Sequence, residues 1–157
     1  LFRSELPAAP FARTLDFLLV EIGPGRALFQ GAPGPAHLNP LGTIHGGWYA
    51  TLLDSALGCA VQTMMPVGRA YTTTELGVNL VKAIPRHVQR VRAEGKVVHC
   101  GRQLATAEAR LFGPDLVRLA LQHIGLVARL MGWLRGSPAA PTPRTTGPSS
   151  TRLPAAT

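Results

Sequence analysis

A long helix is the clearest element that the pattern of hydrophobic and polar positions predicts. Between residues 46 and 65, apolar pairs recur at the spacing of one buried helical face. These pairs are Trp48/Tyr49, Leu52/Leu53, Ala56/Leu57, Ala60/Val61 and Met64/Met65. Pro66 and Gly68 follow the last pair and predict the end of the helix.

Upstream of this helix, the pattern predicts a hairpin and then a loop. Residues 15–22 are rich in apolar side chains and favour a strand, which Gly23-Pro24-Gly25 would end. Residues 26–30 are the expected hairpin partner. Pro and Gly recur too often in residues 31–44 for a helix or a strand, so a loop is expected there.

Downstream of the helix, the hydrophobic period changes to two. Apolar and polar positions alternate in residues 71–82, 88–98 and 102–112, as in strands that are covered on one face. The three segments predict an antiparallel meander with short turns. Because the apolar helix is the natural cover for the meander, the predicted fold class is α+β.

The C-terminal region departs from this pattern. Residues 116–135 are apolar, but the alternation fades, and Arg118, Gln122 and Arg129 fall roughly at helical spacing. Residues 136–157 consist almost entirely of Pro, Ser, Thr, Ala, Gly and Arg, a composition that cannot bury a core. We therefore predict one domain over residues 1–135 and a disordered tail over residues 136–157.

Charge and cysteine content narrow the class of protein. Of the net charge of +8, residues 116–157 contribute 5 Arg and no acid, whereas residues 1–115 hold 11 Lys and Arg with all 8 acids. Most of the basicity thus belongs to the tail, and we expect no nucleic-acid partner. No membrane-spanning run and no signal peptide are visible. Cys59 and Cys100 favour a reducing cytoplasm over a disulfide framework.

The candidate chemistry centres on Asp54. It is the only formal charge between Arg26 and Arg69 and lies in the apolar helix, where an unpaired carboxylate is costly to bury. At the predicted helix start, Gly46-Gly47 presents backbone N–H groups at the positive end of the helix dipole. Such donors suit an oxyanion or a thioester carbonyl. Asn39, in the preceding loop, would add an amide donor or hold a water.

The distance between these residues constrains this hypothesis, and each residue also has a purely structural interpretation. Asp54 lies roughly 10–12 Å along the helix axis from Gly46 and Gly47, so two copies of the chain would have to meet if both groups act on one substrate. Alternatively, Asp54 is a structural carboxylate, Gly46-Gly47 is only a flexible helix start, and His45 fixes a local hydrogen bond. No metal-ligand spacing and no phosphate-binding glycine loop is present, so neither a metal nor a cofactor is predicted.

A set of basic residues between positions 86 and 102 also has two interpretations. The residues form a solvated sheet face, or a subset of them holds the phosphates of a nucleotide-like carrier. They are Arg86, Arg90, Arg92, Lys96 and Arg102.

The run HLNPLGTIHGG at residues 37–47, followed by Asp54, resembles the PaaI-like (phenylacetate-pathway) acyl-CoA thioesterases of the hot-dog fold. The resemblance covers about residues 15–113 and includes TTTEL at 72–76, VNL at 78–80 and GKVV at 95–98. It implies an antiparallel sheet wrapped around one long central helix. It also implies that two subunits form a continuous sheet with active sites at their interface.

The resemblance implies roles for individual residues. Asp54 would be the catalytic carboxylate, as nucleophile or as general base for water. Gly46 would supply the oxyanion-hole amide, and Asn39 would position the water or the thioester. Thr73 falls where family members often have an assisting hydroxyl. The remaining candidates are His45 for catalysis and Gly47, Trp48 and Arg102 for substrate binding, with Arg102 directed to the CoA phosphates.

The implied function is hydrolysis of an acyl-CoA thioester by a homodimer or a dimer of dimers. The alternative is a non-catalytic hot-dog domain that binds an acyl carrier or another protein. After Phe112 the family pattern predicts a tight turn and one more alternating strand, which this sequence does not show. A shifted reading frame or an unusual extension would account for that departure.

Overall fold

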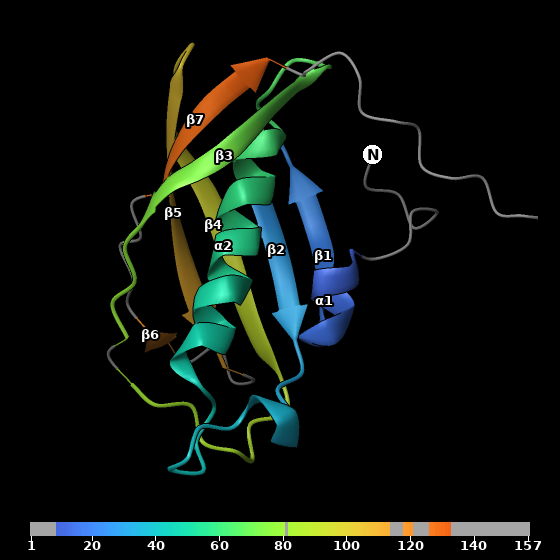
Figure 1. Cartoon of the computed structure of the whole chain (residues 1–157), viewed down its shortest axis with the longest axis vertical. Coiled ribbons are helices and arrows are strands. Elements are labelled where there is room, and N and C mark those ends of the chain that lie inside the picture. Colours follow the sequence, from blue (N-terminus) through green and yellow to red (C-terminus); the bar gives the residue numbers. More distant parts are fainter. Residues whose placement is uncertain (1–8, 81, 114–117, 121–125, 133–157) are drawn as a thin grey trace, which may run out of the picture.

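The computed structural model describes residues 9–80, 82–113, 118–120 and 126–132 of the chain. Seven strands form one antiparallel sheet in the order β1-β2-β4-β5-β7-β3, with β6 pairing with β5. The sheet curves around α2 (Figure 1), so the predicted α+β class is confirmed. The elements are α1 (Pro10–Thr14), β1 (Phe17–Gly23), β2 (Arg26–Gly31), η1 (Pro35–His37), α2 (Gly46–Gln62), β3 (Arg69–Leu76), β4 (Val91–Cys100), β5 (Leu104–Phe112), β6 (Arg118–Ala120) and β7 (Leu126–Gly132).

The helix α2 forms where the apolar pairs predict it and fills the inner face of the sheet. Leu52, Leu53 and Leu57 are completely buried, and each stabilises the fold by about 1.5–3 kcal/mol through the loss of apolar surface to water. The sheet meets them with small buried residues on three strands. These are Ala27, Ala93, Gly95, Ala105, Ala107 and Ala109. Small residues at the contact let the helix backbone approach the sheet closely.

The predicted meander is wrong, because β3 and β4 are not neighbours. β4 pairs with β2 and β5, whereas β3 pairs with β7 at the far edge. The connection between β3 and β4 lies beside the loop that precedes α2. The Ile44 N–H of that loop donates to the Ile84 carbonyl oxygen of the connection at 3.1 Å. Ile84 and Val88 are buried and anchor this connection. Alternation fixes the face that each residue takes, but not which strand lies next to it.

The closing strand of the sheet is present although the alternation fades. β7 lies between β5 and β3: residues 126–132 pair with β3, and residues 126–129 pair with β5 as well, so the first half of the strand bonds to neighbours on both sides. The roughly helical spacing of the polar residues in this region does not mark a helix at the described positions, because Arg118 lies in β6 and Arg129 in β7. Gln122 and the predicted tail at residues 136–157 lie outside the described residues.

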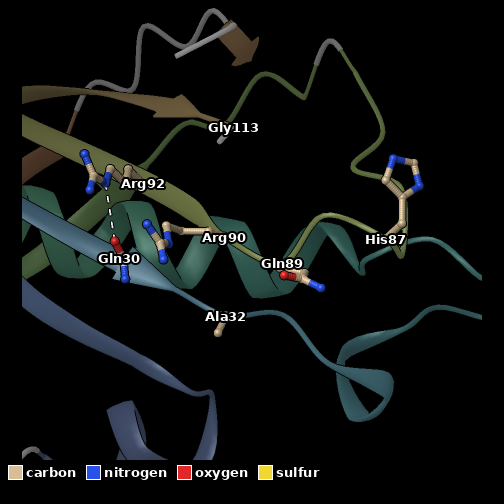
Figure 2. Close-up of a pocket in the computed structure, with 7 residues that line it drawn as sticks. All are labelled: Gln30, Ala32, His87, Gln89, Arg90, Arg92 and Gly113. Atoms are coloured by element: carbon tan, nitrogen blue, oxygen red, sulfur yellow. Dashed lines mark hydrogen bonds between the residues drawn. The ribbon is translucent and has the colours of Figure 1, made fainter. Parts of the chain in front are cut away.

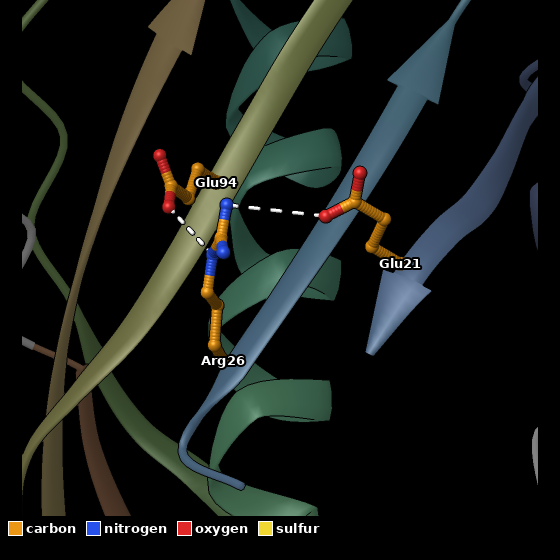
Figure 3. A network of polar contacts seen from close by, with 3 residues as sticks. All are labelled: Glu21, Arg26 and Glu94. Atoms are coloured by element: carbon orange, nitrogen blue, oxygen red, sulfur yellow. Dashed lines mark ion pairs between the residues drawn. The ribbon is translucent and has the colours of Figure 1, made fainter. Parts of the chain in front are cut away.

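The outer face of the sheet carries an ion-pair network across three strands (Figure 3). Arg26 Nε lies 2.7 Å from Glu94 Oε1, and Arg26 Nη2 lies 3.9 Å from Glu21 Oε2. Solvent screens these exposed pairs, so each contributes about 1 kcal/mol or less. The network links β1, β2 and β4 on the side away from α2.

Candidate active site

Asp54 meets a hydroxyl group from the edge strand β3, which crosses α2 (Figure 1). Thr73 Oγ1 donates a hydrogen bond to Asp54 Oδ1 at 3.3 Å. Asp54 is half-buried, and no cation among the described residues forms an ion pair with it. The structure therefore brings together two of the sequence-predicted site residues from separate elements.

Burial controls the protonation of this cluster. It raises the pKa of Asp54 above the ordinary value, and the hydrogen bond from Thr73 offsets part of that rise. Burial and the Asp54 charge raise the pKa of the Cys59 thiol to about 11. Burial, with the charges of Cys59 and Asp54, raises the pKa of Tyr71 to about 12. Cys59 and Tyr71 are therefore neutral near pH 7, and Asp54 is the group in this cluster suited to accept a proton.

Tyr71 is a residue near the site that the sequence reasoning missed. A Cβ at Gly58 would collide with the Tyr71 hydroxyl oxygen, so the missing side chain of Gly58 is what lets β3 lie close to α2. Tyr71 and Thr73 are two positions apart on β3 and share one face of the strand. That spacing, with Gly58 one turn after Asp54, is the signal that points to Tyr71.

The start of α2 presents a backbone amide that has no acceptor among the described residues. His45 is the N-cap residue, and its Nδ1 accepts a hydrogen bond from the Gly47 N–H at 2.9 Å. The Gly47 amide is therefore engaged. The Gly46 N–H has no acceptor in the part of the chain that the structure describes, and it lies at the positive end of the helix dipole. His45 thus orders the helix start, and Gly46 is the available donor.

Asn39 holds together the loop that precedes α2. Its Oδ1 accepts from the Leu41 N–H at 2.9 Å and the Thr43 N–H at 3.2 Å. Its Nδ2 donates to Thr43 Oγ1 at 2.8 Å. The carboxamide NH₂ has two hydrogens, and Thr43 takes one of them. The structure therefore assigns Asn39 a local structural role, and its role toward a water or a thioester stays a prediction.

Two substrate-binding candidates lie away from this cluster. Trp48 is 4% exposed, and its ring N–H donates to the Leu15 carbonyl oxygen at 2.8 Å. It packs in the core, where the missing side chain of Gly31 makes room for its ring. Arg102 is exposed in the turn between β4 and β5, at the same end of the molecule as the C-terminus of α2 (Figure 1). The structure thus separates Arg102 from the Gly46 amide at the other end of the helix.

Within one chain, Gly46 and Asp54 do not converge. Eight residues of helix separate them by about 12 Å along the axis, so one carbonyl cannot contact both. β3, which carries Thr73, is last in the sheet order, and no described strand pairs with its other backbone edge. The geometry of one chain therefore supplies two half-sites, a carboxylate with its hydroxyl partner and a helix-terminal amide.

Two classes of feature are not found in the described ranges. No group of three or more His, Cys, Asp or Glu residues is placed to hold a metal ion there. None of the described helices is long and apolar enough to span a membrane.

Comparison with known proteins relates this geometry to a family. A family model described as the thioesterase superfamily matches residues 41–120, a segment that includes Asp54 and Thr73. No curated protein matches the chain. Among solved structures, the chain is similar to a thioesterase from Haemophilus influenzae at 14% identity, covering 79% of this chain and 84% of that one, with a TM-score of 0.71.

Two further solved structures are similar to this chain. A mutant of the phenylacetic acid degradation protein PaaI from Thermus thermophilus matches at 23% identity and TM-score 0.62, covering 80% of this chain and 100% of that one. A Streptococcus mutans protein bound to acetyl-CoA matches at 20% identity and TM-score 0.66, covering 75% of this chain and 90% of that one. At these identities the likeness establishes the fold, and the predicted hot-dog architecture is confirmed.

Proposed function

This chain belongs to the thioesterase superfamily, and we propose that it hydrolyses an acyl-CoA thioester to a free carboxylic acid and CoA. The observation that carries the proposal is the half-buried Asp54 carboxylate, which Thr73 orients and no described cation neutralises. The acetyl-CoA complex of the similar Streptococcus mutans protein supports CoA as the thiol portion. The basic test is release of free thiol from a panel of aromatic and straight-chain acyl-CoAs. Acyl-CoA binding without thiol release would favour the non-catalytic alternative.

Two routes through Asp54 fit the same geometry. As a general base, the carboxylate takes a proton from water while the water oxygen attacks the thioester carbon, and the CoA thiolate leaves. As a nucleophile, the carboxylate attacks that carbon itself, the thiolate leaves, and water then hydrolyses the mixed anhydride. In both routes negative charge develops on the carbonyl oxygen, and a backbone N–H such as that of Gly46 stabilises it.

The complete site is proposed to form between two copies of the chain. Because Gly46 and Asp54 of one helix are about 12 Å apart, one substrate can meet both groups only if each comes from a different subunit. The open edge of β3 is where a second copy can extend the sheet. Pairing there would bring a second α2 beside the Asp54–Thr73 cluster, in a symmetric dimer with two equivalent sites.

The Gly46→Pro variant tests the amide donor. Proline removes the N–H but suits the first position of a helix, and the extended backbone of His45 (φ −63°, ψ 134°) is compatible with a following proline. We expect kcat to fall by about 10²–10³-fold. A Gly46→Ala control adds a Cβ near Leu80 Cδ1 but keeps the amide, and it should retain most activity. Equal losses in the two variants would mean that crowding, and not the amide, causes the effect.

Subunit complementation tests the shared site. If each site combines Asp54 of one subunit with Gly46 of the other, a mixed dimer of Asp54→Asn and Gly46→Pro subunits contains one intact site. Random reassociation of equal amounts should then restore about a quarter of the parental activity. The measurement is thiol release after the two inactive variants are unfolded together and refolded. No recovery, in a preparation shown to contain mixed dimers, would contradict a site that combines Asp54 of one subunit with Gly46 of the other.

The Thr73→Val variant tests the hydrogen bond to Asp54. Because this bond lowers the pKa of Asp54, its loss should raise that pKa further and move the acidic limb of the kcat/KM profile to higher pH. We also expect a roughly tenfold loss of kcat, as for a hydrogen bond to a charged group. The matched control is Thr72→Val, a neighbouring residue on the other face of β3. An unchanged pH profile would show that Thr73 does not act through Asp54.

A further inference from the structure

A hollow of about 720 Å³ lies at one end of the sheet, where β2 ends, β4 begins and β5 ends. Figure 2 shows the side chains of Arg90, Arg92 and Gln30 gathered over this end, with His87 farther along the preceding loop. The lining residues are Gln30, Ala32, His87, Gln89, Arg90, Arg92 and Gly113. Its volume is within the range of pockets that bind small-molecule ligands.

The hollow opens on the outer face of the sheet, away from the Asp54 cluster. Gln30 and Arg92 are paired across β2 and β4. Their neighbours Phe29 and Ala93 are buried in the core against α2, and successive side chains of a strand point to opposite faces. Arg90 is two positions before Arg92 and therefore shares the outer face. The hollow is thus separate from the half-sites that contain Gly46 and Asp54.

The described lining of the hollow carries positive charge. None of the described residues that line it has a carboxylate, and neither Arg90 nor Arg92 forms an ion pair within the described part of the chain. Arg92 Nε donates to Gln30 Oε1 at 3.3 Å, which orients the guanidinium while its other N–H groups stay available. Two guanidinium groups side by side offer several donors in the fork geometry that matches phosphate oxygens.

A second hollow on the same outer face has a different charge composition. Its described lining consists of two acids and two bases, whose formal charges balance; they are Glu94, Lys96, Glu108 and Arg110. The sheet surface is therefore not basic throughout. The positive charge is concentrated where Arg90 and Arg92 stand, which argues for a specific anion at that place.

We propose that this hollow binds a nucleotide carrying at least two phosphate groups. The two guanidinium groups would hold the phosphates, and the carboxamides of Gln30 and Gln89 would provide neutral hydrogen-bonding groups for the rest of the ligand. The nucleotide is either the nucleotide portion of a CoA thioester or a free nucleotide, and the first case rests on the proposed function.

This assignment differs from the sequence-based expectation that Arg102 contacts the CoA phosphates. Arg102 follows the C-terminal end of β4, whereas Arg90 and Arg92 stand at its start. Ten residues of strand separate the two ends by about 33 Å. One bound nucleotide cannot bridge that distance, so Arg102 and the hollow of the same chain cannot hold the same nucleotide.

The binding test uses the full chain and isothermal titration calorimetry with ADP and adenosine 3′,5′-bisphosphate. We expect the double variant Arg90→Ala/Arg92→Ala to bind at least one of them about tenfold or more weakly than the parent. The control is Arg110→Ala, which removes the same kind of charge from the same face, and it should bind within about twofold of the parent. Equal affinities of parent and double variant, equal losses in the control, or no binding of either nucleotide by the parent would overturn the proposal.

Kinetics then distinguish the two sources of the nucleotide. If it is part of the substrate, the double variant should raise the KM for acyl-CoA relative to the KM for an acyl-pantetheine, which lacks the nucleotide. If it is a free ligand, calorimetry will show the loss of binding while this KM ratio stays at the parental value. Because calorimetry needs no turnover, a chain that binds nucleotide but releases no thiol would refute the proposed hydrolysis and leave the nucleotide site supported.

Discussion

Asp54→Asn is expected to lower kcat for acyl-CoA hydrolysis by about 10²–10⁴-fold, the contribution typical of a positioned acid–base group. Asparagine keeps the size of the side chain and an oxygen that can accept the Thr73 hydrogen bond, but it can neither take a proton nor attack a thioester. The loss should appear in kcat and kcat/KM together, because ground-state contacts with the substrate are retained. The rate of thiol release under saturating acyl-CoA measures the loss of kcat.

The same substitution should not destabilise the fold at neutral pH. The pKa of Asp54 is raised in the folded state above its ordinary value of 3.8, so the stability linked to its protonated form is present below that value and is lost as pH rises through the raised pKa. The asparagine side chain would carry no charge at any pH. The melting temperature of the variant at pH 7 should therefore equal or exceed that of the parent, and the difference should shrink as pH falls toward 3.8.

Asp16→Asn is the matched control for this experiment. Asp16 is exposed and has a positive φ of 53°, a conformation that asparagine tolerates well. The Asp16→Asn substitution makes the same chemical change outside the Asp54 cluster, and the variant should retain parental turnover. If Asp54→Asn hydrolyses the acyl-CoA panel as fast as the parent, Asp54 is a structural carboxylate and the catalytic assignment is wrong.

Gly95→Ala is expected to destabilise the protein by about 2–3 kcal/mol, the upper part of the usual range for overpacking. A Cβ at Gly95 would collide with the carbonyl oxygen of Ala56 and lie 2.8 Å from the Leu57 backbone nitrogen. Both atoms belong to the backbone of α2, so no side-chain rotation relieves the contact. The helix must move away from β4, which opens the packing beneath the Asp54 turn.

Chemical denaturation of parent and variant measures this effect. For a chain of this length, the melting temperature should fall by roughly 5–10 °C. Gly23→Ala is the control, because Gly23 also lies in a strand and nothing stands within 4 Å of the Cβ it would gain. That control should change stability only slightly. A Gly95→Ala protein as stable as the parent would show that the helix and sheet can separate without cost.

Local elements were predictable because each depends on neighbouring residues. The apolar pairs from Trp48 to Val61 predict α2, and period-two alternation predicts most of β4 and β5. The isolated acid at position 54 indicates the candidate site, because an unpaired carboxylate in an apolar helix is costly to bury. The predicted helix start indicated Gly46, and the family resemblance added Thr73. The structure places Thr73 against Asp54 and leaves the Gly46 amide without a described acceptor.

Other features required the folded chain because they join residues that are far apart in sequence. The close approach of Tyr71 to Gly58 joins an edge strand to the helix. Arg90 and Gln30 line one hollow only because β4 pairs with β2. The family resemblance made Trp48 a candidate for substrate binding, whereas in the folded chain its ring is buried in the core beside Gly31.

The long helix, the sheet-forming segments, the carboxylate on which the proposed chemistry depends and its distance from Gly46 all follow from the amino-acid sequence, since hydrophobic period, an isolated charge and helix rise are local properties. The strand order and the closing strand β7 follow only from the folded chain. It also gathered Arg90 and Arg92 without a described acid beside them. These outcomes depend on which backbone edges pair and how closely the layers pack, and the free energy of such contacts exists only once the chain is folded.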